Sequence, residues 1–292
     1  MKKTAVIAVS TGCLDYLDIN HDNLYMVRCK IVLRDDTYDD YTEIKADDFY
    51  QTIKQDTSLV PTSSMPSIGE ITQTFEQIES AGYESAILIS ISSQLSGTFQ
   101  TAQMAANSYE GNLNIQVLDT KNAAISEGFI SLEALRLIDE GASVTDIMAY
   151  LSTLSLARRQ YFMVDNLRLL VKNGRLSGAK GFMGRMLKMK PILQVNDEGK
   201  IVPFEKVRTQ NKALKKMVDT ILDDLATVDD FVITYDTSDN KEGFEYVFNR
   251  IEKHYPNHRY YAAPITPVIG AHTGAGTIGV AYFDLAKARG EK

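Results

Sequence analysis

Residues 85–102 read SAILISISSQLSGTFQTA, and this stretch holds the change in composition that decides the fold. The apolar run 85–91 has the length and composition of a strand that is buried on both faces. A loop rich in hydroxyl groups follows at once, and residues 97–108 have the composition of a helix. A strand, a polar loop and a helix in this order are typical of one unit of a parallel α/β sheet.

The same alternation continues along the chain. Further apolar runs occupy 5–9 and 114–118, and helical patterns cover 67–80 and 121–139. We therefore predict an α/β fold with two mixed α/β domains, 1–157 and 158–292, the first built on a parallel sheet covered by helices. The expected elements of the second domain are a basic helical stretch (166–188), a hairpin (192–204), helices at 210–226 and 240–254, and strands at 230–236, 258–263 and 277–283.

Length and cysteine content bound the class of protein. A chain of 292 residues can form two domains of ordinary size without a disulfide or a metal. Cys13 and Cys29 do not form a CxxC pair, which favours a reduced, cytoplasmic setting. The apolar run near the N-terminus is too short for a signal peptide or a membrane span.

The charge is uneven along the chain. The formal net charge is −7, which argues against nucleic-acid binding by the whole surface. Between Asp165 and Asp197, in contrast, there are seven basic residues and no acidic one. This stretch is either a docking face or a solvated helical face. Its basic residues are Arg168, Lys172, Arg175, Lys180, Arg185, Lys188 and Lys190.

The loop after residue 90 is a candidate anion site. A helix N-terminus at the carboxyl edge of a parallel sheet presents free N–H groups, and ligands usually bind at that edge. Gly97 would allow a close approach of the backbone, and Ser96 would supply a donor. The alternative is that Ser96 or Thr98 merely caps the helix.

Two other stretches have similar chemistry. In PTSSMPS (61–67), Ser67 and Glu70 have the spacing of a capping box, which leaves the hydroxyls at 62–64 without a structural role. The stretch 266–283 contains His272 before GAGTIG, which formally matches a dinucleotide fingerprint. It lacks the following helix and the later acidic residue, so we reject the match. No sequence motif indicates a metal site.

Three stretches taken together resemble one family. SSMPS (63–67), SSQLSGT (92–98) and AHTGAGTIG (271–279), supported by GRLSGAKG (174–181) and VRTQN (207–211), resemble the DegV family of bacterial fatty-acid-binding proteins. The resemblance implies a cytoplasmic carrier without catalysis or cofactor, which holds one long-chain fatty acid between two domains. The implied partner is a fatty acid kinase that makes acyl phosphate for phospholipid synthesis, and transient membrane contact is compatible with this role.

The resemblance also assigns residues position by position. The family's fatty-acid carboxylate-binding residues fall on Ser63 with adjacent Thr62, Ser96 with Gly97, His272 and Arg208, and its kinase-docking arginine falls on Arg175. One departure is visible, because Val9 stands where the family usually has an aspartate. Candidates for the tail pocket, which could equally belong to the core, are Phe99, Ile125, Phe129 and Met186.

A catalytic alternative also exists. Ser96, Asp236 and His272 occur in the chain order of an α/β-hydrolase triad, and each lies near the end of an apolar run. A serine esterase of this type would have a G-x-S-x-G elbow, however, and this chain has glycine only directly after Ser96. We therefore prefer the fatty-acid carrier.

Overall fold

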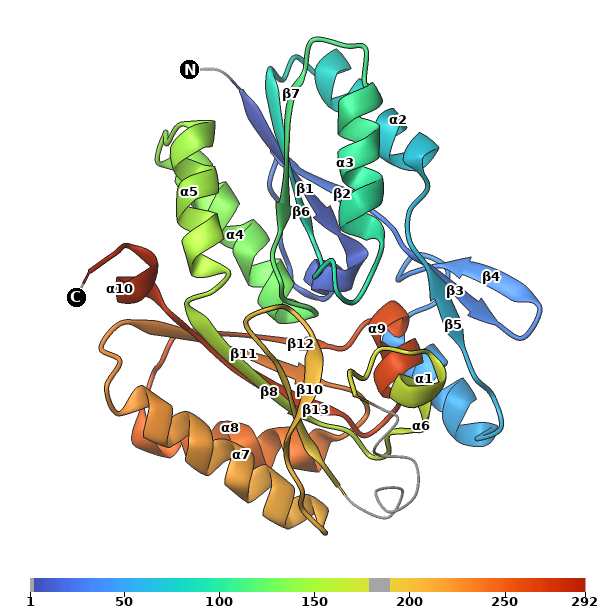
Figure 1. Cartoon of the computed structure of the whole chain (residues 1–292), viewed down its shortest axis with the longest axis vertical. Helices are drawn as coiled ribbons and strands as arrows, with labels where there is room; N and C mark the ends of the chain where they lie inside the picture. The colour runs from blue at the N-terminus through green and yellow to red at the C-terminus, as the bar shows by residue number, and fades with distance from the viewer. Residues whose placement is uncertain (1–2, 179–189, 292) are drawn as a thin grey trace.

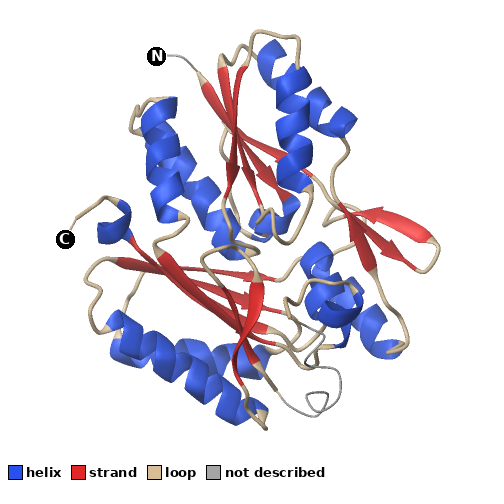
Figure 2. Cartoon of the chain, in the orientation of Figure 1, coloured by secondary structure: helices blue, strands red, loops and turns tan. Residues whose placement is uncertain are grey.

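The computed structural model describes residues 3–178 and 190–291. Two α/β halves are stacked on each other, and a small antiparallel sheet projects at one side (Figure 1). Helices and strands alternate through both halves, as Figure 2 shows. The mixed α/β fold predicted from the sequence is therefore confirmed.

The first half is built on a four-stranded parallel sheet. Its strand order is β2 (Leu24–Val27), β1 (Thr4–Val9), β6 (Ser85–Ser90) and β7 (Asn114–Asp119). Both β1 and β6 are buried along their whole length, which explains their continuous apolar composition. The expected strands at 5–9, 85–91 and 114–118 are thus present.

Helices cover both faces of this sheet. Ile7 of β1 packs in one core cluster with Phe75 and Ala102, whereas Val6 points to the other face and packs with Phe129 and Leu151. Ser67 caps one of these helices, because its Oγ accepts from the N–H of Glu70 while Glu70 Oε2 accepts from the N–H of Ser67. The four helices are α2 (Ile68–Ser80) and α3 (Thr98–Ser108) on one face, and α4 (Ile125–Asp139) and α5 (Val144–Leu154) on the other.

The second half contains a six-stranded sheet that is antiparallel except for its last pair. The strand order is β10 (Ile201–Glu205), β9 (Ile192–Val195), β8 (Arg158–Met163), β13 (Ile278–Asp284), β11 (Phe231–Thr237) and β12 (Tyr260–Pro264). Helices α7 (Gln210–Leu225) and α8 (Lys241–His254) cover its outer face. Within the described part of the expected helix 166–188, only α6 (Arg168–Lys172) is helical.

Several elements were not predicted from the sequence. Three short strands form an antiparallel sheet at the side of the molecule, next to a helix that lies between the second and the third of them in the chain (Figure 1). A further helix lies near the C-terminus, and short helical turns follow β1 and β13. These elements are η1 (Ser10–Gly12), η2 (Leu14–Tyr16), β3 (Lys30–Leu33), β4 (Asp36–Asp39), α1 (Ala46–Gln55), β5 (Thr62–Ser64), α9 (Pro267–Thr273) and α10 (Leu285–Ala288).

Helix α9 belongs to the second half in sequence but packs against the first. Val268 and Ala271 are part of the core cluster that contains Ile7 and Phe75. The carboxylate of Asp40 lies at the N-terminus of α9. Its Oδ1 accepts from Thr266 Oγ1 (2.7 Å) and from the N–H of Val268 (3.3 Å). A negative charge at a helix N-terminus is favourable. The first half therefore depends on a segment more than 200 residues later in the chain.

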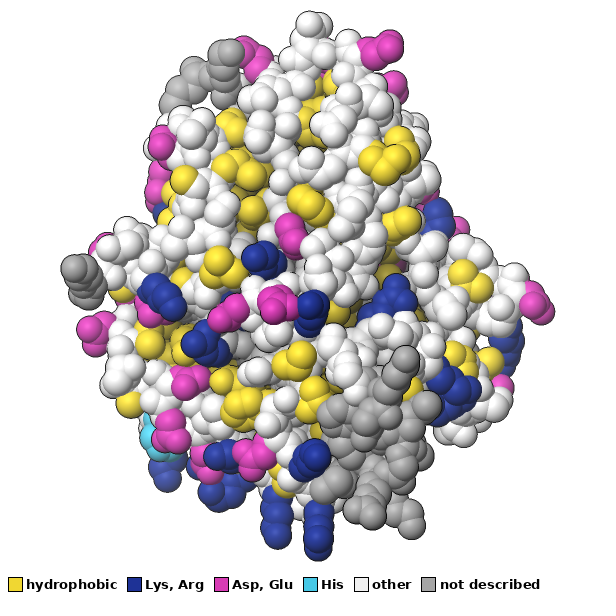
Figure 3. All heavy atoms as spheres, viewed as in Figure 1, with side chains coloured by type: hydrophobic (Ala, Val, Ile, Leu, Met, Phe, Trp, Pro, Cys, Tyr) yellow, Lys and Arg dark blue, Asp and Glu magenta, His cyan; other side chains and the backbone are white. Residues whose placement is uncertain are grey.

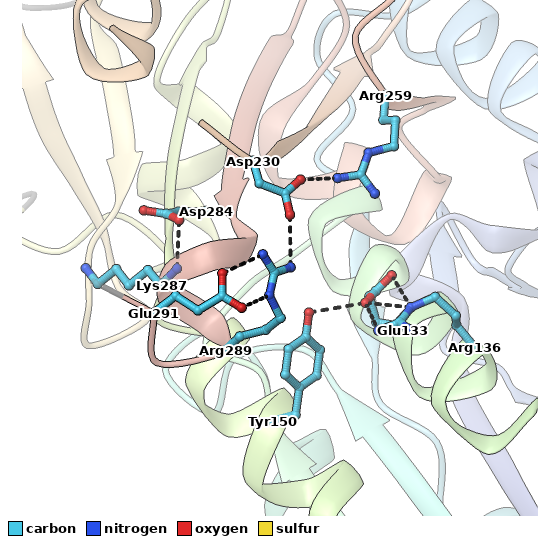
Figure 4. Close-up of polar contacts among 9 residues, drawn as sticks. All are labelled: Glu133, Arg136, Tyr150, Asp230, Arg259, Asp284, Lys287, Arg289 and Glu291. Carbon is cyan, nitrogen blue, oxygen red and sulfur yellow. Dashed lines mark hydrogen bonds and ion pairs between the residues drawn. The ribbon is translucent and has the colours of Figure 1, made fainter. Parts of the chain in front are cut away.

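The C-terminus also returns to the first half. Helix α10 packs against α5, and Arg289 just beyond it contacts both Asp230 and Glu291 (Figure 4). On the neighbouring helices, Glu133 accepts hydrogen bonds from Arg136 and Tyr150. In the described part of the chain, no helix is long and apolar enough to cross a membrane.

Candidate functional site

A cavity of about 700 Å³ lies at the carboxyl edge of the parallel sheet. It is bounded by β5, by the loop between β6 and α3, by α9, and by the segment after α6. Its polar lining includes Thr11, Ser63, Ser64, Ser67, Ser96, Arg175, His272 and Thr273. Its apolar lining includes Met65, Ile68, Ile91, Leu95, Met104, Ala123, Ile201, Val268 and Ile269.

Ser63 and His272 meet in the wall of this cavity although they are 209 positions apart. Strand β5 pairs with β3, which turns Ser63 toward α9, and the Oγ of Ser63 lies 2.8 Å from Nε2 of His272. Nδ1 of His272 is buried and has no hydrogen-bond partner among the described residues. Burial, and then the charge of Arg175, lower the pKa of His272 to about 4. The imidazole is therefore neutral at physiological pH.

Ser96 and Gly97 form the second part of the wall, at the start of α3. Ser96 Oγ lies 2.8 Å from Thr98 Oγ1 and accepts weakly from the N–H of Thr98 (3.3 Å). Gly97 is the N-cap residue, and a Cβ there would lie only 2.7 Å from Sδ of Met65. The loop thus has some of the local capping that the sequence allowed, and it also faces the cavity.

Among the described residues that line the cavity, Arg175 is the cationic one. Its Nε donates to the carbonyl of Leu95 (3.2 Å), and its Nη1 donates to the carbonyl of Asn173 (2.5 Å). These bonds hold the guanidinium beside the hydroxyl loop and close enough to influence His272. Arg208, by contrast, is exposed just before α7 and does not line the cavity. Thr62 is also exposed and outside the lining, whereas Ser63 and Ser64, the next two residues of β5, both line the cavity.

Comparisons with known sequences and structures identify the protein family of this chain. A family model described as "Uncharacterised protein, DegV family" matches residues 3–285. The chain belongs to the DegV family. Protein DegV of Bacillus subtilis is 33% identical over 279 residues, which cover 95% of this chain and 98% of that protein.

Solved structures of the DegV family have the same fold. The crystal structure of Bacillus subtilis DegV, described as a fatty acid binding protein, has a TM-score of 0.88 at 31% identity and covers 97% of this chain and 100% of that one. A fatty acid binding DegV family protein of Streptococcus agalactiae has a TM-score of 0.89 at 28% identity, covering 97% and 99%. The Streptococcus pneumoniae Fatty Acid Kinase B3 protein, loaded with linoleic acid, has a TM-score of 0.84 at 22% identity, covering 97% and 99%, and shows the fold alone.

Val9, where the resemblance implied an aspartate, is the last residue of β1 and is fully buried in the core. A different acid reaches the same loop from α4. Thr11 lines the cavity and donates from Oγ1 to Oε1 of Glu127 (2.7 Å), and burial raises the pKa of Glu127 well above its usual range. Sequence reasoning missed Glu127, because one glutamate in a helical pattern gives no signal of its burial.

The described residues do not form the hydrolase triad. His272 pairs with Ser63 rather than Ser96, and Ser96 pairs with Thr98. The carboxylate of Asp236 accepts from the backbone N–H of Ile125 (3.0 Å) instead of orienting a histidine. The esterase alternative is therefore not supported. The described residues also contain no cluster of three His, Cys, Asp or Glu side chains that could hold a metal ion.

The basic stretch between Asp165 and Asp197 is partly structural. Arg168 donates to the backbone carbonyls of Thr57 (2.5 Å) and Ser58 (2.8 Å), and Lys190 forms an ion pair with Asp165. Among the tail candidates, Phe99, Ile125 and Phe129 do not line the cavity. Lys180, Arg185 and Lys188 of the basic stretch and Met186 of the tail candidates lie outside the described residues.

Proposed function

We propose that this chain binds a long-chain fatty acid, with the tail inside the cavity and the carboxylate held by Ser63, Ser96, His272 and Arg175. The observation that carries the proposal is the buried, neutral His272. One ring nitrogen is hydrogen-bonded to Ser63, and the other has no hydrogen-bond partner among the described residues. When Nε2 of His272 carries the ring proton, it donates to Ser63 Oγ, and the Ser63 hydroxyl keeps its own proton for another acceptor. A ligand carboxylate beside Ser63 is that acceptor.

The tail supplies most of the binding free energy. Transfer of one methylene from water into an apolar site contributes about 0.8 kcal/mol, so a dozen methylenes contribute about 10 kcal/mol before entropic costs are subtracted. The apolar lining of the cavity, with Ile91, Ile201 and Ile269 among its members, suits this role. Such a site selects for an extended apolar chain.

The carboxylate requires polar partners because its desolvation is costly. Neutral hydroxyl donors and one arginine satisfy it through charge-assisted hydrogen bonds. Ser63 and His272 form a hydroxyl–imidazole pair, but no described carboxylate accepts from Nδ1 of His272 to orient it as a general base. We therefore propose that the chain is a carrier rather than an enzyme, and the Bacillus subtilis and Streptococcus agalactiae relatives described as fatty acid binding proteins support this proposal.

The test is mass spectrometry of an organic extract from the purified protein, quantified per mole of protein. We expect about one fatty acid per chain. Ser63→Ala should lower retention of added octadecanoic acid at least fivefold, because a partner of the carboxylate is lost. The matched control is Thr62→Ala, since Thr62 is the adjacent hydroxyl and lies outside the cavity lining. A protein that carries no fatty acid and takes none up would disprove the proposal.

We also propose that a fatty acid kinase phosphorylates the bound carboxylate. The support is the similar fold of the Streptococcus pneumoniae protein, whose name places it in a fatty acid kinase system. On the face shown in Figure 3, most Lys and Arg side chains lie over the half that contains the six-stranded sheet. Arg208 is exposed, whereas Arg175 lines the cavity, so the geometry favours Arg208 for docking and Arg175 for the carboxylate.

The kinase proposal is tested with the two arginines separately. Arg208→Glu should slow ATP-dependent phosphorylation of the bound fatty acid by a DegV-associated fatty acid kinase at least tenfold, with fatty-acid retention unchanged. Arg175→Gln should lower retention itself. Lys253→Glu, an exposed reversal on α8, is the control. If Arg208→Glu and wild type are phosphorylated at equal rates, Arg208 is not part of a docking surface.

A further inference from the structure

A second, smaller cavity of about 50 Å³ adjoins the main one. The two share the wall residues Ala123, Ile201, Ile269 and Thr273, so the small cavity continues the main one toward the interface between the halves. We call it the inner chamber. Its volume exceeds that needed for one water molecule, so a small group of a ligand fits in it.

The inner chamber lies on the face of the six-stranded sheet that meets the first half. Strand pairing aligns Phe162 of β8 with Gly279 of β13 and Asp236 of β11. Gln160 lies two residues from Phe162, on the same face of β8. A Cβ on Gly279 would lie 3.2 Å from Oδ2 of Asp236. The absence of a side chain at Gly279 therefore keeps space open next to Asp236 and Phe162, and Gln160 also lines the inner chamber.

Two polar side chains of the inner chamber have unused hydrogen-bonding capacity. Gln160 is only 6% exposed, and while its Nε2 donates to the carbonyl of Ala123 (3.1 Å), its Oε1 has no partner among the described residues. Asp236 is equally buried and accepts one described hydrogen bond, from Ile125 N–H. Burial raises the pKa of Asp236 to about 7, so its neutral form offers an O–H donor. A purely apolar tail would leave both groups unsatisfied.

We propose that the acyl chain bound by this protein carries a hydroxyl group remote from its carboxylate, and that this hydroxyl donates to Gln160 and accepts from Asp236. The inference rests on the proposed function, because it names the class of fatty acid that the same site selects. A hydroxyl both donates and accepts, as this pair requires. A keto group only accepts, and a methylene does neither.

The experiment is a competition for the protein after its lipid has been removed. Octadecanoic acid is mixed in equal amounts with each member of a series of monohydroxyoctadecanoic acids that differ in hydroxyl position, and the bound acids are extracted and quantified by mass spectrometry. We expect at least one hydroxy acid to exceed octadecanoic acid about tenfold or more, because a buried acceptor left unpaired is costly. Positions that do not reach the inner chamber should show no preference.

Variants connect this preference to the inner chamber. Gln160→Met removes the unpaired oxygen at similar volume and should lower the ratio of hydroxy acid to octadecanoic acid about tenfold, with total fatty acid unchanged. Gln194→Met is the control, because Gln194 is on the adjacent strand β9 and, being paired with Tyr161, faces the opposite side of the sheet from Gln160. Gly279→Ala tests the same point independently if the first variant does not fold, since its methyl group fills the chamber.

The outcomes separate this inference from the proposed function. Binding of octadecanoic acid with no preference for any hydroxy acid overturns the inference, assigns the inner chamber to water, and leaves the carrier role intact. A preference that persists in both Gln160→Met and Gly279→Ala also overturns it. A wild-type protein that retains no acid of either kind contradicts the carrier role itself.

Discussion

Asp236 is a single residue whose protonation is set by burial. Its carboxyl keeps a proton up to about pH 7 in the folded chain, whereas an unfolded aspartate releases it near pH 4. Between these values the folded state binds more protons than the unfolded state. The free energy of unfolding therefore falls as the pH rises from about 4 to about 7, and this loss persists at higher pH.

We expect Asp236→Asn to relieve this loss. The amide oxygen can still accept from Ile125, and no ionisation competes with burial. At pH 8 the variant should be more stable than wild type by about 1–4 kcal/mol, and the gain should shrink toward zero near pH 4. The measurement is urea unfolding of both proteins at each pH. The two proteins are compared by the difference between their free energies of unfolding. The lowered pKa of His272 makes this free energy rise with pH in both proteins, so its effect cancels in the difference.

The control for this prediction is Asp197→Asn, whose side chain is 74% exposed. Its effect on the free energy of unfolding should be small and nearly the same at pH 4 and pH 8. If the free energies of unfolding of Asp236→Asn and wild type differ by the same amount at pH 4 and pH 8, the carboxyl of Asp236 is not held neutral by burial. The stability of the molecule would then owe its pH dependence to other groups.

Single residues also show how far a sequence can predict a site. The resemblance carried by the hydroxyl-rich loops and the HTG stretch indicated Ser63, Ser96 and His272, and these three line one cavity. It does not bring Thr62 or Arg208 there. The position of β5 relative to the cavity follows from its pairing with β3, so the sequence alone could not separate Ser63 from Thr62. The position of Arg175 depends on backbone contacts with Leu95 and Asn173, which have no sequence signal.

At the scale of elements, Arg158 joins the two halves behind the cavity. It begins β8 and is almost fully buried. Its guanidinium donates to the carbonyls of Lys121 (2.8 Å), Val195 (3.0 Å) and Asn196 (3.0 Å), and to Oδ1 of Asn122 (2.6 Å). These acceptors lie on the loop after β7 and on the β9–β10 hairpin. One side chain thus fixes elements that hold Ala123 and Ile201 in the cavity wall.

Arg158→Met should lower the free energy of unfolding by about 3 kcal/mol or more, because several buried acceptors lose their donor at once. Fatty acid should also dissociate faster, since the cavity walls on the two halves are no longer fixed to each other. Denaturant unfolding and the retention of octadecanoic acid during dialysis measure the two effects. Arg159→Met is the control, because Arg159 is the next residue and its side chain is 44% exposed. Equal losses in both variants would contradict the role assigned to Arg158.

The elements differ in how well the sequence predicted them, for physical reasons. The strands of the parallel sheet are buried on both faces, so their apolar runs were visible. Strand β5 contains only Thr and Ser, and β4 is largely exposed, so neither has a hydrophobic pattern. Helix α9 has seven residues, among them β-branched residues and a glycine, and its helical form depends on Asp40 and on packing against α1.

At the scale of the whole molecule, the two sheets are separate but their cores are not. The expected boundary near residue 157 falls between α5 and β8, where the chain passes from the four-stranded to the six-stranded sheet. Yet α9 completes the core around β1 and α2, and Phe283 and Leu285 pack in the cluster that contains Phe129. We therefore propose that 1–157 and 158–292 are structural halves rather than independently folding domains.

This proposal predicts the behaviour of a fragment. Residues 1–157 alone should not unfold cooperatively, because removal of α9 and the end of β13 exposes apolar surface on both faces of the first half. Thermal unfolding followed by circular dichroism, with the full chain as reference, should give a sharp transition for the full chain and a broad, non-cooperative change for the fragment. A fragment with its own sharp transition and a dispersed amide NMR spectrum would show an autonomous domain. In a shared core, His272 reaches Ser63 only when both halves are folded, so the proposed carboxylate site should form together with the fold and not before it.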